Sequence, residues 1–305
     1  MQPEFDPDKI ALIGVPSSAG ARKVGQEQAP QCLRAAGLVQ SLQSNGHEVV
    51  DLGDLTPATF SPDTQNPQQQ NLALVLGVVR QVAEAVDAAI ANRAWPLIIG
   101  GDCTVTIGVV AALSKHFEGL GMTYLDGDLD LNTPATTLSG IFDGMVLAHI
   151  LGRGADELSH IGSRYPLLEE QNITLFGYSA EAGGVDPVEI ELLKNSRMAK
   201  YPFEEIKDEV RTAAARALSD LESKAAQVLV HFDVDVIDVD DFPAVDVPHK
   251  PGLSLLQAQE ALGVFLGSRN SVGLVVTEFN AAMDSDGKLA RQLAATIQAA
   301  IAKRQ

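Results

Sequence analysis

The chain alternates short apolar runs with longer segments of helical periodicity, and this alternation restricts its possible folds more than any other feature. Apolar runs of about five residues, bounded by Gly, Pro or Asp, predict buried strands. Apolar residues at i, i+3 and i+4 predict helices. Strands that alternate with helices form a parallel sheet covered on both faces. The expected class is therefore α/β, with about eight strands.

The same pattern predicts where the elements lie. No linker interrupts the alternation, so we expect residues 1–305 to form a single domain, with an exposed loop over 56–70 where Pro, Asn and Gln accumulate. The expected strands are 10–15, 48–52, 96–99, 122–126, 173–176, 198–201, 228–234 and 271–278, and the expected helices are 29–42, 72–91, 105–116, 144–151, 204–226, 255–266 and 289–302.

Composition limits the classes of binding partner and the cellular compartment that we expect for the chain. The chain has 40 acidic and 22 basic residues and a formal net charge of −18, which disfavours nucleic acid and anionic membranes and favours metal ions or basic small molecules. Two cysteines form no disulfide framework, and the acidic N-terminus does not resemble a signal peptide. Since no apolar run is long enough to span a membrane, we expect a soluble, cytoplasmic protein.

Acidic residues gather at the ends of three expected strands. Gly100-Gly101-Asp102-Cys103 follows one, Asp126-Gly127-Asp128-Leu129-Asp130 follows another, and Asp233-Val234-Asp235 ends a third. Ligands of open parallel sheets bind at the carboxyl ends of the strands. Isolated ionised carboxylates are costly where a buried strand ends, and divalent cations would offset that cost.

Other interpretations apply to single members of these groups. Asp102 alone is about equally consistent with a helix cap, and Asp126–Asp130 lacks the Gly and terminal Glu of a calcium loop. The Gly pair at 100–101 lacks both phosphate-loop patterns. His231 shares a strand face with Asp233, as either a partner of a ligating carboxylate or a satisfied core histidine.

Together, these motifs resemble the ureohydrolase family of arginases, agmatinases and formimidoylglutamases. Gly100–Cys103 resembles the family's Gly-Gly-Asp-His, and Asp126–Asp130 resembles its Asp-Ala-His-x-Asp. Phe232–Asp235 with Asp238 resembles its Ser-Phe-Asp-x-Asp and the following Asp, and Glu278-Phe279-Asn280 resembles Glu-Val-Asn. The resemblance covers nearly the whole chain and implies a three-layer α/β/α fold with a parallel eight-stranded sheet.

The resemblance also implies a two-manganese centre that hydrolyses small cationic guanidino substrates. Asp130 would orient the attacking hydroxide, Glu278 would pair with the guanidinium, and Asp143 falls where arginases carry a proton-shuttling His. Asn132 and Ser139 match the arginase loop that contacts an α-carboxylate, while Asp186 and Glu181 are candidates for an α-amino group. The implied metal ligands are Cys103, Asp126, Asp128, Asp130, Asp233 and Asp235.

The chain departs from the arginase pattern at three positions. Cys103, Asp128 and Asp143 stand where active-site histidines are expected. Carboxylates suit manganese, whereas a thiolate shifts the preference toward zinc or iron, so either of those metals could replace manganese. A more anionic ligand set makes the metals weaker Lewis acids, so we expect slower chemistry or a different pH optimum. Cys103 could instead be an ordinary small buried residue.

The sequence therefore predicts a binuclear metallohydrolase of a guanidino amino acid such as arginine or Nω-hydroxy-arginine. One alternative is an inactive arginase-fold protein with a binding or regulatory role, because three histidines are replaced. Another is a hydrolase of a different C–N bond, of the formimino or agmatine type. By resemblance, we expect a homo-oligomer, either a trimer or a hexamer.

Overall fold

The fold is built on one sheet of parallel strands. A computed structural model describes residues 3–179 and 185–304. Its eight-stranded sheet has the order β2-β1-β3-β8-β7-β4-β5-β6, and every neighbouring pair is parallel. This confirms the expected α/β class. The strands are β1 (Lys9–Gly14), β2 (Glu48–Asp54), β3 (Trp95–Ile99), β4 (Leu120–Leu125), β5 (Ile173–Phe176), β6 (Ala199–Tyr201), β7 (Gln227–Asp233) and β8 (Ser271–Thr277).

Successive side chains along each strand enter opposite hydrophobic cores. In β1, Ile10 and Leu12 pack into one core, while Ala11 and Ile13 pack into the other. This is the period of two expected of a strand that is buried on both faces. It explains why the inner strands read as continuous apolar runs.

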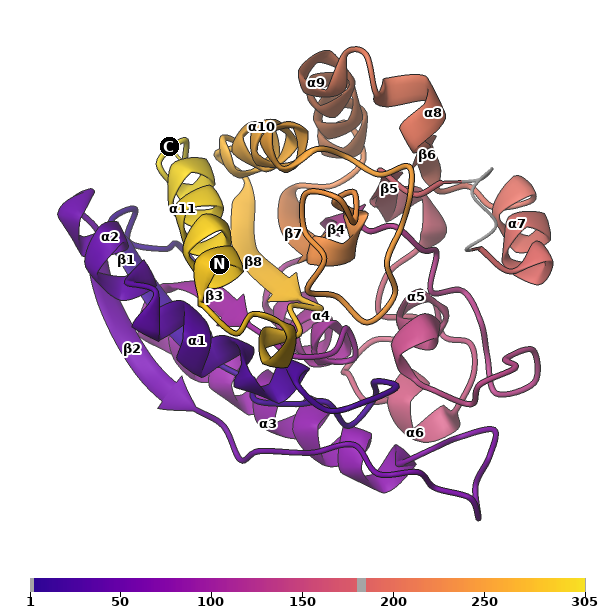
Figure 1. Ribbon diagram of the computed structural model, residues 1–305. Helices are drawn as coiled ribbons and strands as arrows, with labels where there is room; N and C mark the ends of the chain where they lie inside the picture. Colours follow the sequence, from indigo (N-terminus) through magenta and orange to yellow (C-terminus); the bar gives the residue numbers. More distant parts are fainter. Residues whose placement is uncertain (1–2, 180–184, 305) are drawn as a thin grey trace.

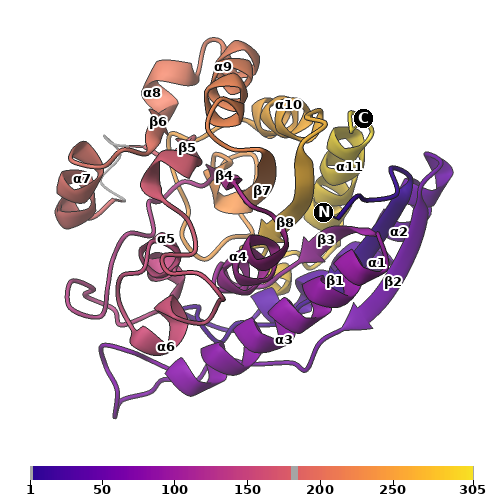
Figure 2. The same ribbon diagram turned by 180° about the vertical axis from the view of Figure 1, so that it is seen from behind.

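Helices cover both faces of the sheet, and Figures 1 and 2 show the two layers from opposite sides. Their side chains divide between the two cores accordingly. One layer contains α3 (Leu72–Ala91), α4 (Val105–His116), α5 (Val146–Ile150), α6 (Asp156–Ser159) and α7 (Pro187–Lys194). The other contains α1 (Ala29–Ala35), α2 (Leu38–Ser44), α8 (Phe203–Ile206), α9 (Val210–Glu222), α10 (Leu255–Leu266) and α11 (Lys288–Ile301).

The structure breaks two segments that the sequence predicts as single helices. The segment 29–42 divides at Gly37, which adopts φ +88° and is the N-cap of a second helix. The segment 204–226 divides between Ile206 and Val210. The sequence prediction also misses α6 and α7 and makes the helix at 144–151 too long, because 143–145 form a 3-10 turn.

The four central strands place their carboxyl ends beside one another. In the order β3-β8-β7-β4, each strand leads into one of the polar motifs found in the sequence. The polar motifs therefore meet at the carboxyl ends of the central strands.

Among the described residues, no helix has both the length and the apolar character needed to cross a membrane.

Candidate metal centre

The strand ends surround a cavity of about 380 Å³. Loops after β3, β4, β7 and β8 supply its inner wall, and the loop 132–144 and the start of α7 supply the outer wall. The cavity brings together every predicted site residue that the structure describes. They are Cys103, Asp126, Asp128, Asp130, Asn132, Ser139, Asp143, Asp186, Asp233, Asp235 and Glu278.

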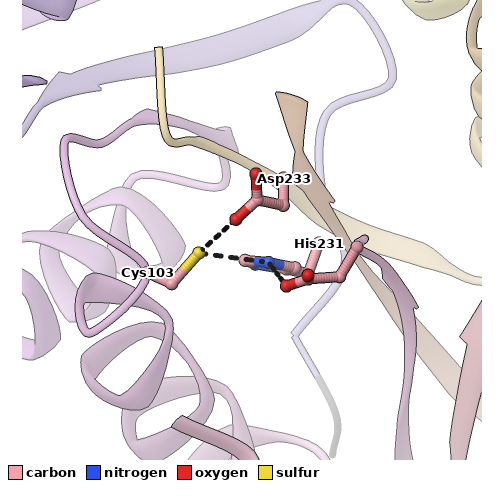
Figure 3. Close-up of side chains that lie close together, drawn as sticks. Cys103, His231 and Asp233 are labelled. Carbon is pink, nitrogen blue, oxygen red and sulfur yellow. Dashed lines mark hydrogen bonds and ion pairs between the residues drawn. The ribbon is translucent and has the colours of Figure 1, made fainter. Parts of the chain in front are cut away.

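Cys103 lies just before α4 and points into the carboxylate cluster. Its Sγ is 2.8 Å from Asp233 Oδ2 and 3.7 Å from His231 Nε2. Figure 3 marks both contacts with dashed lines. Its backbone N–H donates to Asp143 Oδ1 at 2.7 Å. Burial raises the pKa of the thiol well above its usual range, and the charge of Asp233 raises it further. The thiol therefore keeps its proton and donates a hydrogen bond to Asp233 Oδ2.

Asp102 has a structural role instead. Its Oδ2 accepts hydrogen bonds from Ser17 Oγ at 2.7 Å and from Gly20 N at 3.2 Å, while Oδ1 accepts from Thr104 N. Gly101 lets this loop approach closely, because a Cβ there would lie 1.6 Å from the Ser17 carbonyl oxygen. Asp102 thus fastens the loop after β1 against the start of α4.

The middle motif leaves β4 through a tight turn. Asp126 Oδ1 accepts from Asp128 N at 2.6 Å, which closes the turn. Asp130 adopts φ +49°, a left-handed conformation that is uncommon outside glycine. Tyr124 Oη donates to Asp130 Oδ2 at 2.5 Å. The turn thus directs Asp126, Asp128 and Asp130 into the cavity without an extended strand.

In the third motif, too, an Asp carboxylate accepts a hydrogen bond from the backbone N–H two residues later. Asp233 is the last residue of β7, and its Oδ1 accepts from Asp235 N at 2.8 Å. Asp235 lies in a 3-10 turn, and its Oδ1 accepts from Gly127 N at 3.2 Å, which joins the second and third motifs. Both carboxylates line the cavity and are almost completely buried.

Glu278 follows β8 in a second left-handed conformation, at φ +68°. Gln26 Nε2 donates to its Oε2, and its backbone N–H donates to Gly101 O at 2.8 Å. Burial raises the pKa of Glu278, and the neighbouring Asp143 raises it further. Two functional candidates, Asp130 and Glu278, thus occupy sparsely populated backbone conformations, which are typical of active sites.

The electrostatics of the cluster favour a cation. Burial raises the pKa of Asp126 and of Asp233 well above the usual range of a carboxyl, and in both cases the charge of Asp235 adds to the effect. Like charges in a buried space cannot all ionise without compensation. A bound divalent cation is often the largest local charge and reverses this preference.

The donor atoms also fit metal ions. Within the described residues, Asp126 Oδ2 and Glu278 Oε1 are buried without a hydrogen-bond partner. Three groups of residues each offer ligand atoms that lie within 4.8 Å of one another inside the group. These groups are Cys103, Asp126, His231 and Asp233; Cys103, Asp143 and Glu278; and Asp128, Asp235 and His249. A pair of divalent cations would satisfy these carboxylates.

Two imidazoles reach the cluster from positions outside the predicted ligand set. His231 is fully buried, with Nδ1 2.9 Å from Thr106 Oγ1 and Nε2 3.9 Å from Asp126 Oδ2, and its ring stacks on Tyr124. Burial lowers the pKa of His231 to about 3, so the ring is neutral. Of the two interpretations left open for this residue, the geometry favours the partner of a ligand.

Sequence reasoning missed His249 altogether. It lies in the loop between β7 and α10, and its Nε2 is 3.6 Å from Asp128 Oδ2 and 3.7 Å from Asp235 Oδ2. Burial alone would lower the pKa of His249, but Asp235 and Asp128 outweigh it and raise the pKa to about 11. The sequence carried one indication of this ring. Gly127 stands where the family motif has Ala, and a Cβ at that position would collide with His249.

The outer wall carries the residues expected to contact the substrate. Asn132 Oδ1 accepts from Thr136 Oγ1 at 2.9 Å, and Ser139 Oγ is 3.3 Å from Thr137 Oγ1. Asp186 caps α7, accepting from Val188 N at 2.9 Å. Glu181 lies outside the described residues.

Glu189 is a second residue that sequence reasoning missed. It is buried in the first turn of α7, lines the cavity, and accepts a hydrogen bond from Leu131 N at 2.7 Å. Burial raises its pKa to about 7. The only signal available was its spacing of three residues from Asp186, the capping-box pattern.

Comparisons with known proteins agree with this geometry. The arginase family matches residues 8–302. The arginase of Bacillus subtilis is 28% identical over 295 residues, which is 97% of this chain and 98% of that protein. The crystal structure of the Bacillus cereus arginase superposes with a TM-score of 0.87 at 29% identity, covering 96% of this chain and 97% of that one. The native Bacillus caldovelox arginase gives a TM-score of 0.89 at 27% identity, covering 99% and 98%. With its sheet and nearly its full length matched, the chain belongs to the arginase family.

Proposed function

We propose that this protein is a binuclear metal-dependent hydrolase that cleaves the guanidino C–N bond of an amino acid, arginine or Nω-hydroxy-arginine. One observation carries the proposal: five acidic side chains from three strand ends converge, buried, on one cavity. They are Asp126, Asp130, Asp233, Asp235 and Glu278. Burying that many carboxylates is costly unless cations compensate for them.

Two bound divalent cations would supply an acidified water for attack on the guanidino carbon. Asp130 would accept a hydrogen bond from that water through Oδ1 and orient it, because Tyr124 donates to its other oxygen. Glu278 binds the guanidinium and orients its carbon toward the water. Asp143, whose pKa burial raises, would take up the proton that the water releases and pass it to the leaving amine. Water thus adds to the carbon as the C–N bond breaks, giving an amine and urea or a urea analogue.

The substrate lies with its guanidino group at the acidic end of the cavity and its amino-acid end at the mouth. Asn132 and Ser139 contact the α-carboxylate there, and Asp186 faces the α-amino group. Glu189 lies beside Asp186 and adds negative charge to the same wall when it is ionised. An amino acid with a small cationic side chain satisfies both ends.

Three further properties belong to the same proposal. Manganese is the expected metal because most of the donors are carboxylate oxygens, with iron or zinc as substitutes because Cys103 is a thiol. The working form is a homo-oligomer, a trimer or a hexamer, in the cytoplasm. Residues 1–305 act as one domain, which the single continuous sheet supports.

Metal stoichiometry tests the proposal directly. Protein refilled with Mn²⁺, desalted and measured by mass spectrometry should hold about two ions per chain. The loaded protein is then assayed with arginine, Nω-hydroxy-arginine, agmatine and N-formimino-glutamate. We expect turnover with one of the first two.

Glu278→Gln is the matched control, because it should lose turnover while the bound metal remains. Absence of both metal and turnover, with iron and zinc also tried, would favour the inactive binding protein. Turnover with agmatine or the formimino compound alone would assign a different C–N bond.

A further inference from the structure

We propose that His249 is a metal ligand of this centre and that its imidazole replaces the histidine that the family motif carries at position 128. The inference rests on the proposed function, since it assigns one ligand of the same site. It concerns a residue that belongs to none of the motifs that identified the family.

The position of the ring is the first argument. His249 Nε2 lies 3.6 Å from Asp128 Oδ2 and 3.7 Å from Asp235 Oδ2. A charge-assisted hydrogen bond would be shorter, at about 2.7–2.9 Å. Two ligands each about 2.1 Å from one small cation lie roughly 3.0–3.5 Å apart, close to the distances seen here. The ring nitrogen thus points between two carboxylates, at a distance that suits a shared ion.

The burial of the ring is the second argument. His249 is only 5% exposed, and among the described residues its Nε2 makes two long ion pairs, with Asp128 and Asp235, but no hydrogen bond. A buried polar nitrogen without a hydrogen bond is unfavourable. Coordination of a cation held by Asp128 and Asp235 would satisfy it.

The loop holds the ring in place. The His249 carbonyl accepts from Val239 N at 3.0 Å, and Gly252 N donates to Asp238 Oδ2 at 3.1 Å. Leu253 N then donates to Val236 O at 2.9 Å, close to Asp235. The loop is therefore fastened at several points to the turn that carries Asp235. A ligand held in this way needs little reorganisation to bind an ion.

Gly127 provides an independent argument. A Cβ at position 127 would lie 2.3 Å from His249 Cδ2, so the ring fits only because residue 127 is glycine. The family motif has Ala at 127 and His at 128, and this chain has Gly and Asp. This chain thus lacks the imidazole at position 128, has another at His249, and has at Gly127 the space that the second ring needs.

A cycle of variants tests the assignment through metal binding. Isothermal titration with Mn²⁺ is compared for the wild type, His249→Ala, Gly127→Ala and the double variant. We expect His249→Ala to weaken the second Mn²⁺ by more than about 100-fold, since loss of residues that only support a ligand already costs 10–100-fold. Gly127→Ala should have a similar effect because it displaces the ring, and the double variant should bind no more weakly than His249→Ala.

His160→Ala, at an exposed histidine stacked on Tyr165, is the matched control and should bind both ions normally. Thermal melting of every variant verifies folding, with His249→Gln in reserve if the alanine variant does not fold. A further variant, Gly127→Ala/Asp128→His/His249→Ala, restores the family motif and should recover the second ion.

The outcomes separate the two proposals. Unchanged binding of both ions by His249→Ala would overturn the assignment and leave the proposed function intact. Tighter binding would also overturn it, because it would make His249 a cation that competes with the metal. A wild-type protein that binds no divalent ion would overturn both proposals.

Discussion

At the scale of single residues, two of the predicted site residues have backbone conformations that are uncommon outside glycine. Asp130 and Glu278 both have positive φ values, although neither is glycine. Each is held there by neighbours: Tyr124 bonds to one and Gln26 to the other. Such strain persists only when the surroundings determine the position of the residue, and it costs of order 1–3 kcal/mol for each residue.

Asp235→Asn tests the core of the site. The amide has the shape of the carboxylate but lacks its charge, so we expect turnover to fall at least about 100-fold and one Mn²⁺ to be lost. The melting temperature of the metal-free protein should not fall, because one negative charge leaves a buried acidic cluster. Urea release and metal content measure the effect, with Asp156→Asn, on an exposed helix, as the control. Unchanged turnover would exclude Asp235 from the centre.

At the scale of elements, the sequence predicts the motifs well and the breaks between helices poorly. Strand ends such as Asp126 and Asp233 were recognisable because a buried apolar run stops abruptly at an acid. The division at Gly37 was not, because apolar periodicity continues on both sides of it. His249 could not be placed, because loop residues carry no periodicity that relates them to a distant strand end.

Helix α10 begins with a capping box, a local sequence signal whose contribution to the free energy of unfolding can be measured. Ser254 accepts a hydrogen bond from Gln257 N at 3.2 Å, and Gln257 Oε1 accepts from Ser254 N at 2.8 Å. Ser254→Ala should therefore lower the free energy of unfolding by about 1 kcal/mol in urea denaturation. Ser285→Ala, in an exposed turn, should change it by no more than a few tenths. Equal effects of the two variants would contradict the role of the cap.

Helix α5 contains a buried histidine that should make stability depend on pH. His149 Nδ1 is 2.7 Å from Met145 O, and its Nε2 accepts from Ala155 N at 3.1 Å, an arrangement that requires the neutral ring. Burial lowers its pKa from about 6.5 to about 4. Between those pH values the unfolded chain binds a proton that the native protein does not. The free energy of unfolding therefore decreases as pH falls from 6.5 to 4.

The contribution of His149 over that range is about 3 kcal/mol, from 2.5 pKa units at 1.36 kcal/mol each. Urea denaturation at several pH values should show a weaker dependence in His149→Gln than in the wild type, while His160→Gln should match the wild type. Parallel curves for the wild type and His149→Gln would refute the assignment.

At the scale of the whole molecule, metal binding and folding are linked. The proposed ligands extend from Cys103 to Asp235 and meet only in the folded sheet, so the unfolded chain has no such site. An ion at 100 times its dissociation constant stabilises the native state by about 2.7 kcal/mol. Mn²⁺ should therefore raise the melting temperature by about 5–10 °C, and a chelator should reverse the rise. Scanning calorimetry measures this. A rise of the same size in Asp235→Asn would show that the ions bind elsewhere.

Strand β8 is the last strand in the chain, yet it lies in the middle of the sheet, between β3 and β7. Until it is synthesised, β2-β1-β3 and β7-β4-β5-β6 are two separate half-sheets, each with one unpaired apolar edge beside the future site. Such edges readily pair with other chains. The ribosome must therefore extend the nascent protein past residue 277 before either edge is protected. For this chain, the period of greatest aggregation risk ends when β8 pairs with β3 and β7, and the same pairing assembles the proposed metal centre.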